Sequence, residues 1–157
     1  MNRHIRKATL EDLETLLTWG ESLWKTELAY EERMLYSKDF YRQQDLKELQ
    51  NEHALILIGE LAEKPVGYLY AHIDPTPDYL AGNDLECEIE VIYLEPEARW
   101  QGLAQELIEE CIQWAKEKNV RRLKTGIYAQ NTASLNAFRK SGFYDHHITL
   151  IRESENK

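Results

Sequence analysis

The feature that most constrains the fold is a strand-like stretch that runs through a short loop into a long amphipathic helix. Glu86 to Leu94 alternates acidic and apolar residues and then becomes wholly apolar, which is typical of a half-exposed strand that enters a core. From Gly102 to about Lys118, apolar residues recur at helical spacing and form one stripe, Leu103, Leu107, Cys111 and Trp114. A strand that leads directly into such a helix predicts layers of helix packed on sheet.

The rest of the chain also divides into strand and helix patterns. Strands are expected at His4 to Lys7, Ala54 to Gly59, Val66 to Ile73, Arg122 to Ala129 and Phe143 to Arg152. Helices are expected from Leu13 to Gly20, from Lys38 to about Glu52 and from Thr132 to Lys140, with caps at Thr9 and Asp12, Ser37 and Gly142. The order β-α-α-β-β-β-α-β-α-β predicts a mixed α/β fold.

Length and charge narrow the class of protein. The chain has 157 residues without a repeat or a linker, so one domain over residues 1–157 is expected. Its 19 basic and 28 acidic residues give a net charge of −9, which disfavours a general nucleic-acid binder. No apolar run approaches the ~20 residues of a membrane span, and no apolar stretch follows the charged N-terminus. Neither membrane association nor a signal peptide is therefore expected.

The cysteines and histidines predict neither a disulfide framework nor a metal site. Cys87 and Cys111 both lie within apolar patterns, so buried free thiols in a reducing cytoplasm are expected. His53 and His72 have no partners at ligand spacing, and the adjacent His146 and His147 alternate faces of a strand.

The loop between Leu94 and Ala104 is the strongest candidate for chemistry. Gly102 and the small Ala104 let another group approach the backbone, and the first amides of the following helix lack intrahelical acceptors. Such a junction suits an anion, most naturally phosphate or pyrophosphate, and Arg99 adds a positive charge. The loop is neither a Walker loop nor a three-glycine dinucleotide motif. By itself it fits an ordinary helix start equally well.

Two motifs in order resemble those of a known family. Arg99-x-x-Gly102-x-Ala104, after the strand Glu88 to Leu94, looks like the acyl-CoA pyrophosphate loop of the GNAT superfamily of N-acetyltransferases. Asn131-x-x-Ser134-Leu135-x-x-Phe138-x-Lys140-x-Gly142-Phe143 is similar to the family's downstream helix and the start of its last strands. The resemblance implies a mostly antiparallel twisted sheet with a splayed parallel strand pair and flanking helices. Its acyl-CoA-binding core would span about residues 86–143.

The resemblance also implies acetyl-CoA as cosubstrate and a set of residues that contact it. The backbone amides of Trp100, Gln101, Gly102, Leu103 and Ala104 would hold the pyrophosphate, with Arg99 beside it. Backbone groups of Ile92 and Leu94 would meet pantetheine, and the Ile92 amide would stabilise the tetrahedral oxyanion. The other implied contacts are Tyr93, Asn131, Ser134, Phe138 and Lys140.

Amine acetylation also needs a base, because an amine with a pKa near ~10 is protonated at neutral pH. Glu86, Glu88 and Glu90 are expected on one strand face. Glu88 occupies the position where some family members place a catalytic glutamate, and Glu90 is nearer the thioester. The choice between them is open, and so is the simpler interpretation of a solvated acidic face.

The general acid is the clearest departure from the family pattern. Many relatives carry a tyrosine at the position of Phe138, whose hydroxyl protonates the departing thiolate, and phenylalanine cannot do so. Tyr128 is the first alternative, and Tyr93, Tyr144, water or an unprotonated thiolate remain open.

Charge placement completes the functional expectation. Between Lys64 and Arg99 there are eight acidic and no basic residues, whereas basic residues prevail from Arg99 to Lys140, which predicts a cationic acceptor and a polyanionic cosubstrate. The expected activity is transfer of an acetyl group from acetyl-CoA to a primary amine of a small molecule, polyamine or protein by direct attack. The alternative is an acyl-CoA-binding regulatory module with weak or no catalysis. A homodimer that pairs through Phe143 to Arg152 is a family-level expectation.

Overall fold

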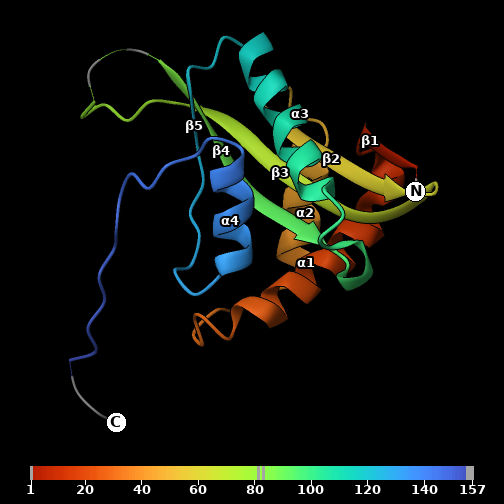
Figure 1. Ribbon diagram of the computed structural model, residues 1–157, viewed down its shortest axis with the longest axis horizontal. Helices are drawn as coiled ribbons and strands as arrows, with labels where there is room; N and C mark the ends of the chain where they lie inside the picture. Colours follow the sequence, from red (N-terminus) through yellow and green to blue (C-terminus); the bar gives the residue numbers. More distant parts are fainter. Residues whose placement is uncertain (1, 81, 83, 155–157) are drawn as a thin grey trace.

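The structure, a computed structural model that describes residues 2–80, 82 and 84–154, contains one five-stranded sheet in the order β1-β2-β3-β4-β5 (Figure 1). The first four strands are antiparallel neighbours, β1 (Arg3–Lys7), β2 (Ala54–Leu61), β3 (Lys64–Pro75) and β4 (Leu85–Leu94). Strand β5 (Arg122–Lys124) pairs parallel to β4 at the edge. The predicted mixed α/β class, with one parallel pair in a mostly antiparallel sheet, is confirmed.

Helices cover both faces of this sheet (Figure 1). One face carries α1 (Leu13–Glu27) and α2 (Lys38–Glu48), and the other carries α3 (Leu103–Glu117) and α4 (Thr132–Lys140). Short 3-10 turns precede α1 and α3, η1 (Leu10–Asp12) and η2 (Pro96–Ala98). Among the described residues, no helix combines the length and the apolar character needed to cross a membrane.

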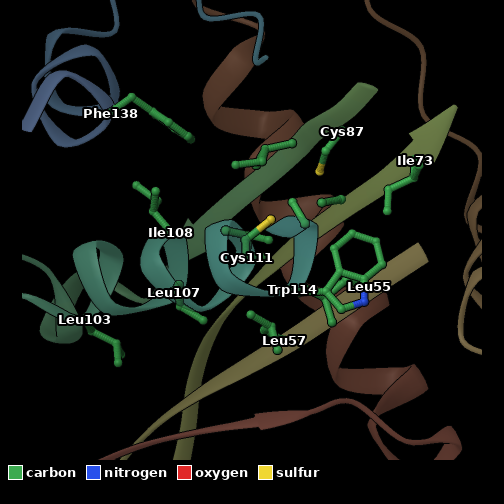
Figure 2. Close-up of a cluster of buried hydrophobic side chains, with 14 of the residues drawn as sticks. Leu55, Leu57, Ile73, Cys87, Leu103, Leu107, Ile108, Cys111, Trp114 and Phe138 are labelled. Carbon is green, nitrogen blue, oxygen red and sulfur yellow. The ribbon is translucent and has the colours of Figure 1, made fainter. Parts of the chain in front are cut away.

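The larger core lies between the sheet and α3. The predicted helix stripe of Leu103, Leu107, Cys111 and Trp114 is buried against side chains of β2, β3 and β4 (Figure 2). Both cysteines are free and buried there, as predicted. Burial of each such aliphatic side chain contributes about 1.5–3 kcal/mol to the free energy of folding, relative to leaving it exposed. This packing holds α3, and with it the loop at its N-terminus, in a fixed place relative to β4.

The smaller core fixes α1 on the opposite face. Trp19 stacks on Tyr68 with ring centroids 5.7 Å apart, and Tyr93 packs beside them. The indole Nε1 of Trp19 donates a 2.7 Å hydrogen bond to the Glu95 carboxylate. Helix α1 is thereby attached to the end of β4 and continues along the sheet beyond Gly20.

The structure corrects the expected ends of the two N-terminal helices. Helix α1 runs to Glu27 instead of Gly20, because a glycine inside a packed helix is tolerated where tertiary contacts hold it. The hydroxyl of Tyr68 lies 3.9 Å from where a Gly20 Cβ would be. Helix α2 ends at Glu48, and the side chains of Glu48 and Asn51 are hydrogen bonded in the turn that follows.

Two expected strands are not formed as predicted. Strand β5 contains three residues instead of the expected Arg122 to Ala129, because the chain leaves β4 after Lys124. Residues 143–152 form no strand in the described structure, and the side chains of Ile148 and Leu150 are exposed. Strand propensity alone does not make a strand, because its backbone groups need a neighbouring edge.

Candidate active site

A cleft of about 440 Å³ opens where β4 and β5 separate. The two strands pair only from Glu86 to Glu88, and the last link is a 2.9 Å hydrogen bond from Thr125 Oγ1 to the Ile89 carbonyl. The cleft is lined by β4, the segment after β5, α4 and the C-terminal part of α1, with these residues: Leu23, Glu27, Glu90, Val91, Ile92, Thr125, Gly126, Ile127, Tyr128, Asn131, Ser134 and Phe138.

A β-bulge shapes the β4 wall of this cleft. Tyr70 pairs with Val91 and Ala71 with Ile89, so Glu90 is an extra residue in β4. A bulge bends its strand and changes the direction of the side chains around it. It therefore explains why β4 diverges from β5 at this position and why Glu90 reaches the cleft.

The backbone of β4 also presents polar groups on the side of the strand that faces away from β3. The Glu95 amide donates a 2.8 Å hydrogen bond to Val66 of β3. Because backbone groups of successive strand residues point to opposite sides, Ile92 and Leu94 direct theirs away from β3. The Leu94 carbonyl accepts a 3.1 Å hydrogen bond from Arg99 Nε, and Ile92 lines the cleft.

The loop before α3 presents a run of free amides. Trp100 and Gly102 adopt positive φ angles of 65° and 83°, which turn successive amides to one side. Among the described residues, no backbone amide from Trp100 to Gln105 donates a hydrogen bond to a backbone carbonyl, and the first that does is the backbone amide of Glu106. With the positive end of the α3 dipole behind it, this loop suits a pyrophosphate.

Arg3 and Arg99 brace this loop from two sides. Arg3 Nη1 donates a 2.6 Å hydrogen bond to the Gln101 carbonyl, and its Nε lies 2.6 Å from Glu106. Arg99 Nε donates its hydrogen bond to the Leu94 carbonyl on the other side of the loop. The sequence predicted Arg99 at the loop but not Arg3, which reaches it from β1 at the far end of the sheet.

An imidazole and two glutamates meet near the cleft. The Nε2 of His72 lies 2.8 Å from a Glu90 oxygen, and its Nδ1 contacts Asp74. Burial lowers the pKa of His72, but hydrogen bonds and charges from Glu90 and Asp74 outweigh it, so the pKa lies above the usual 6.5. One ligand-type atom each from His72, Glu88 and Glu90 lies within 4.8 Å of the others. These contacts form an ion-pair network, with Lys124 also 3.7 Å from Glu88.

The three predicted glutamates are placed differently. Glu90 lines the cleft, whereas Glu88 does not. Glu86 is buried and lies 3.3 Å from Lys124 and 3.8 Å from Arg122, so it ties β4 to β5.

The predicted site residues in α4 and in the segment before it also differ in whether they line the cleft. Tyr128, Asn131, Ser134 and Phe138 line the cleft, and Lys140 does not. Asn131 also caps α4 by accepting a 3.2 Å hydrogen bond from the Ser134 amide. Phe138, which stands where many relatives carry a tyrosine, is only 2% exposed.

Tyr128 faces the N-terminal helices. Its ring centroid is 5.5 Å from that of Tyr30, and its hydroxyl lies 3.7 Å from the Met34 sulfur. Burial raises the pKa of Tyr128, and the negative charges of Glu27 and Glu31 raise it further. Tyr93, by contrast, packs in the small core on the α1 face.

Sequence reasoning missed two functional candidates. Glu27 lines the cleft from the end of α1, and burial raises its pKa above the usual 4.5. It was missed because α1 was expected to end at Gly20. His72 was treated as isolated, although the β3–β4 register places it directly opposite Glu88. The alternation of these two strands was the signal that could have found it.

Known proteins share this architecture. A curated spermidine N(1)-acetyltransferase of Thermoplasma acidophilum is 24% identical over 152 residues, covering 91% of this chain and 89% of the relative. The aminoglycoside N-acetyltransferase AAC(6')-Iy, solved with a bisubstrate analogue, superposes with a TM-score of 0.80 at 19% identity, covering 99% of this chain and 100% of that one. The aminoglycoside 6'-N-acetyltransferase AAC(6')-IG of Acinetobacter haemolyticus gives 0.77 at 22% identity, with both chains fully covered.

The solved structures are less than 25% identical and therefore support the fold alone. The family model supports more than the fold, because it matches residues 16–143, which is well over half of the chain. That range contains the bulge in β4, the loop with the free amides and the whole cleft. The chain belongs to the acetyltransferase (GNAT) family.

Proposed function

We propose that the protein transfers an acetyl group from acetyl-CoA to a primary amine by direct attack within the cleft. The observation that carries this proposal is the position of the cleft between a splayed β4 and α4, with a loop of free amides at the start of α3. A long, polyanionic thioester needs both features, an anion cradle for its pyrophosphate and a slot for its arm.

The residues present fit acetyl-CoA. Amides from Trp100 to Ala104 would hold the pyrophosphate, and a side chain larger than hydrogen at Gly102 would strain its φ of 83°. The arm would run along the backbone of Ile92 and Leu94 toward Asn131, Ser134 and Phe138. Tyr93 would contribute only backbone, because its ring lies in the small core. Lys140 is assigned a peripheral contact at most, since it lies outside the cleft lining.

For the base we favour Glu90 over Glu88, because only Glu90 lines the cleft. Glu90, directly or through a water molecule, takes a proton from the ammonium group, and the free amine attacks the thioester carbon. The Ile92 amide stabilises the oxyanion that forms. The attack forms the C–N bond, and collapse of this tetrahedral intermediate restores the carbonyl and breaks the C–S bond. The second amine proton leaves to solvent.

The departing thiolate has two routes. Tyr128 lines the cleft and carries a phenolic hydroxyl, although that hydroxyl faces Met34. Alternatively CoA leaves as a thiolate, which a thiol pKa near ~8.5 permits. Phe138 supplies only an apolar wall in either route.

The acceptor we propose is a small amine with more than one positive charge. Glu27 and Glu90 place two carboxylates on the lining of one cleft, from different elements. A diamine or polyamine would satisfy both, whereas a neutral amine would leave Glu27 without a partner. The spermidine and aminoglycoside acetyltransferases among the relatives act on amines of this kind by name. Two free thiols support a reducing cytoplasm as the compartment.

The test is calorimetric titration with acetyl-CoA, CoA and ATP, followed by thiol release with a panel of monoamines, diamines, polyamines and aminoglycosides. Selective acetyl-CoA binding with amine-dependent release supports the proposal. Binding of ATP in preference to CoA would refute it. Tight CoA binding without release for any amine would favour the alternative, an acyl-CoA-binding regulatory module, which the apolar Phe138 makes worth testing.

A further inference from the structure

His72 stands between the cleft and a second, smaller hollow. Glu90 lines the cleft, whereas His72 and Asp74 line a hollow of about 290 Å³. The Nε2 atom of His72 lies 2.8 Å from a Glu90 oxygen, and its Nδ1 atom contacts Asp74. The His72 side chain is 21% exposed and that of Asp74 is 65% exposed. One imidazole therefore connects the proposed base to solvent outside the cleft.

Two central strands of the sheet hold these side chains in place. In the β3–β4 register His72 pairs with Glu88, and the bulge makes Glu90 an extra residue of β4. Ala71 and Ile89, the neighbours of His72 and Glu90 in their strands, are buried. Because the core fixes both strands, the contact between His72 and Glu90 belongs to a rigid part of the fold.

The proton that a base removes from an ammonium group must be held long enough for the amine to attack. The ordinary pKa of an amine is about 10, that of an imidazole about 6.5 and that of a carboxyl group about 4.3. A carboxyl group alone therefore returns the proton readily to the amine. An imidazole in contact with the carboxyl group accepts the same proton more favourably, which leaves the amine free for longer.

Asp74 prepares His72 to accept a proton. While the ring is neutral, a carboxylate at Nδ1 keeps the ring proton there and leaves Nε2 free. Once the ring is charged, both carboxylates stabilise it. Burial lowers the pKa of His72, but the hydrogen bonds and charges of Glu90 and Asp74 raise it above the usual 6.5.

Other charged or titratable groups surround the ring on each element packed against it. In the described structure they are Tyr70 on β3, Cys87 and Glu88 on β4, Lys47 and Glu48 on α2, and Lys124, which reaches Glu88 from β5. Two of these groups are acidic and two are basic, so their charges partly offset one another. Glu90 and Asp74, which touch the ring, therefore set its behaviour.

We propose that His72 is a positioning residue that orients Glu90 and receives the proton that Glu90 takes from the acceptor. The proton passes from the ammonium nitrogen to a Glu90 oxygen and then to Nε2 of His72, which becomes an imidazolium. The ring then releases one proton to solvent at the second hollow and is neutral again. This route needs no water in the cleft while acetyl-CoA and the acceptor fill it. The inference rests on the proposed function, because it assigns a partner to the base of that reaction.

The experiment is the pH profile of kcat from about pH 5 to 9, measured as acetylated amine at saturating substrates. In the parent, kcat should rise with pH as the ring becomes neutral. His72→Gln keeps a hydrogen-bonding group beside Glu90 but cannot take its proton. It should lose this rise and lower the maximal kcat by about tenfold or more, a part of the 10²–10⁴-fold that a base contributes. The Kd for acetyl-CoA should stay within about twofold.

His53→Gln is the matched control. His53 also lies beside a carboxylate, 3.6 Å from Glu52, but it is outside the linings of the cleft and of the second hollow. We expect this variant to keep the kcat and the pH profile of the parent. A loss as large as that of His72→Gln would overturn the inference, because the effect would not be specific to the ring beside Glu90.

Asp74→Asn separates proton transfer from structural support. Asp74 is exposed, and its negative charge helps to raise the pKa of His72. Its removal should shift the rise in kcat to lower pH, which a loss of stability would not do. An active parent whose profile is unchanged in His72→Gln or in Asp74→Asn would overturn the inference and leave the proposed function intact. A parent that acetylates no amine would refute the proposed function, and this inference with it.

Discussion

Replacing Glu90 with glutamine tests the assignment of the base most sharply. Glutamine preserves the size of the side chain and can still donate to or accept from His72, which lies 2.8 Å from Glu90. It cannot accept the proton of the attacking ammonium group. Loss of a positioned general base costs about 10²–10⁴-fold in rate. That range corresponds to about 3–5 kcal/mol of activation free energy.

The assay is thiol release at saturating acetyl-CoA, with calorimetry to confirm that acetyl-CoA still binds. We expect kcat/KM of Glu90→Gln to fall by about 10²–10⁴-fold, while the Kd for acetyl-CoA stays within about twofold. Glu88→Gln is the matched control, because Glu88 sits on the same strand but outside the cleft lining. If Glu88→Gln loses the activity and Glu90→Gln retains it, the assignment is reversed. If both retain it, neither glutamate is the base.

Three further predictions address the sheet, the loop and the imidazole. In urea melts, Gly67→Ala should lower the free energy of unfolding by about 1–3 kcal/mol, because the new Cβ would lie 2.3 Å from a β4 carbonyl oxygen. Gly126→Ala should be nearly neutral, because its Cβ would enter open space. Gly102→Ala should weaken acetyl-CoA binding by about tenfold in calorimetry, whereas Gly142→Ala, at a similar positive φ, should leave the affinity unchanged. The raised pKa of His72 means that its ion pairs add stability fully below pH 6.5 and less as pH rises through the folded value. His72→Gln should remove that part of the pH dependence of unfolding, and an unchanged profile would contradict the ion pairs of His72 with Glu90 and Asp74.

Features set by local sequence were predictable. The capping box of Thr9 and Asp12 and the Ser37 cap are present, because each depends on residues within one turn. The apolar stripe of α3 and the position of Gly102 at its N-terminus also follow from local spacing. These elements were enough to place the amide loop after β4.

Features set by pairing between distant segments were not predictable. The contact between His72 and Glu90 depends on the β3–β4 register and on a one-residue bulge, which leaves no local mark in the sequence. Glu27 reaches the cleft because the smaller core around Trp19 holds α1 on the sheet. The pattern in Phe143 to Arg152 is that of a strand, but a strand also requires an edge, and the sequence does not say which one.

Acetyl transfer to an amine within the cleft is tested by measuring both reaction products in one experiment. Purified protein is incubated with acetyl-CoA and a polyamine or aminoglycoside acceptor, and acetylated amine and free CoA are quantified by mass spectrometry. We expect one acetylated amine for each CoA released, and we expect Glu90→Gln to lose both products together. Free CoA without acetylated amine, or neither product from an acceptor panel despite tight acetyl-CoA binding, would contradict it.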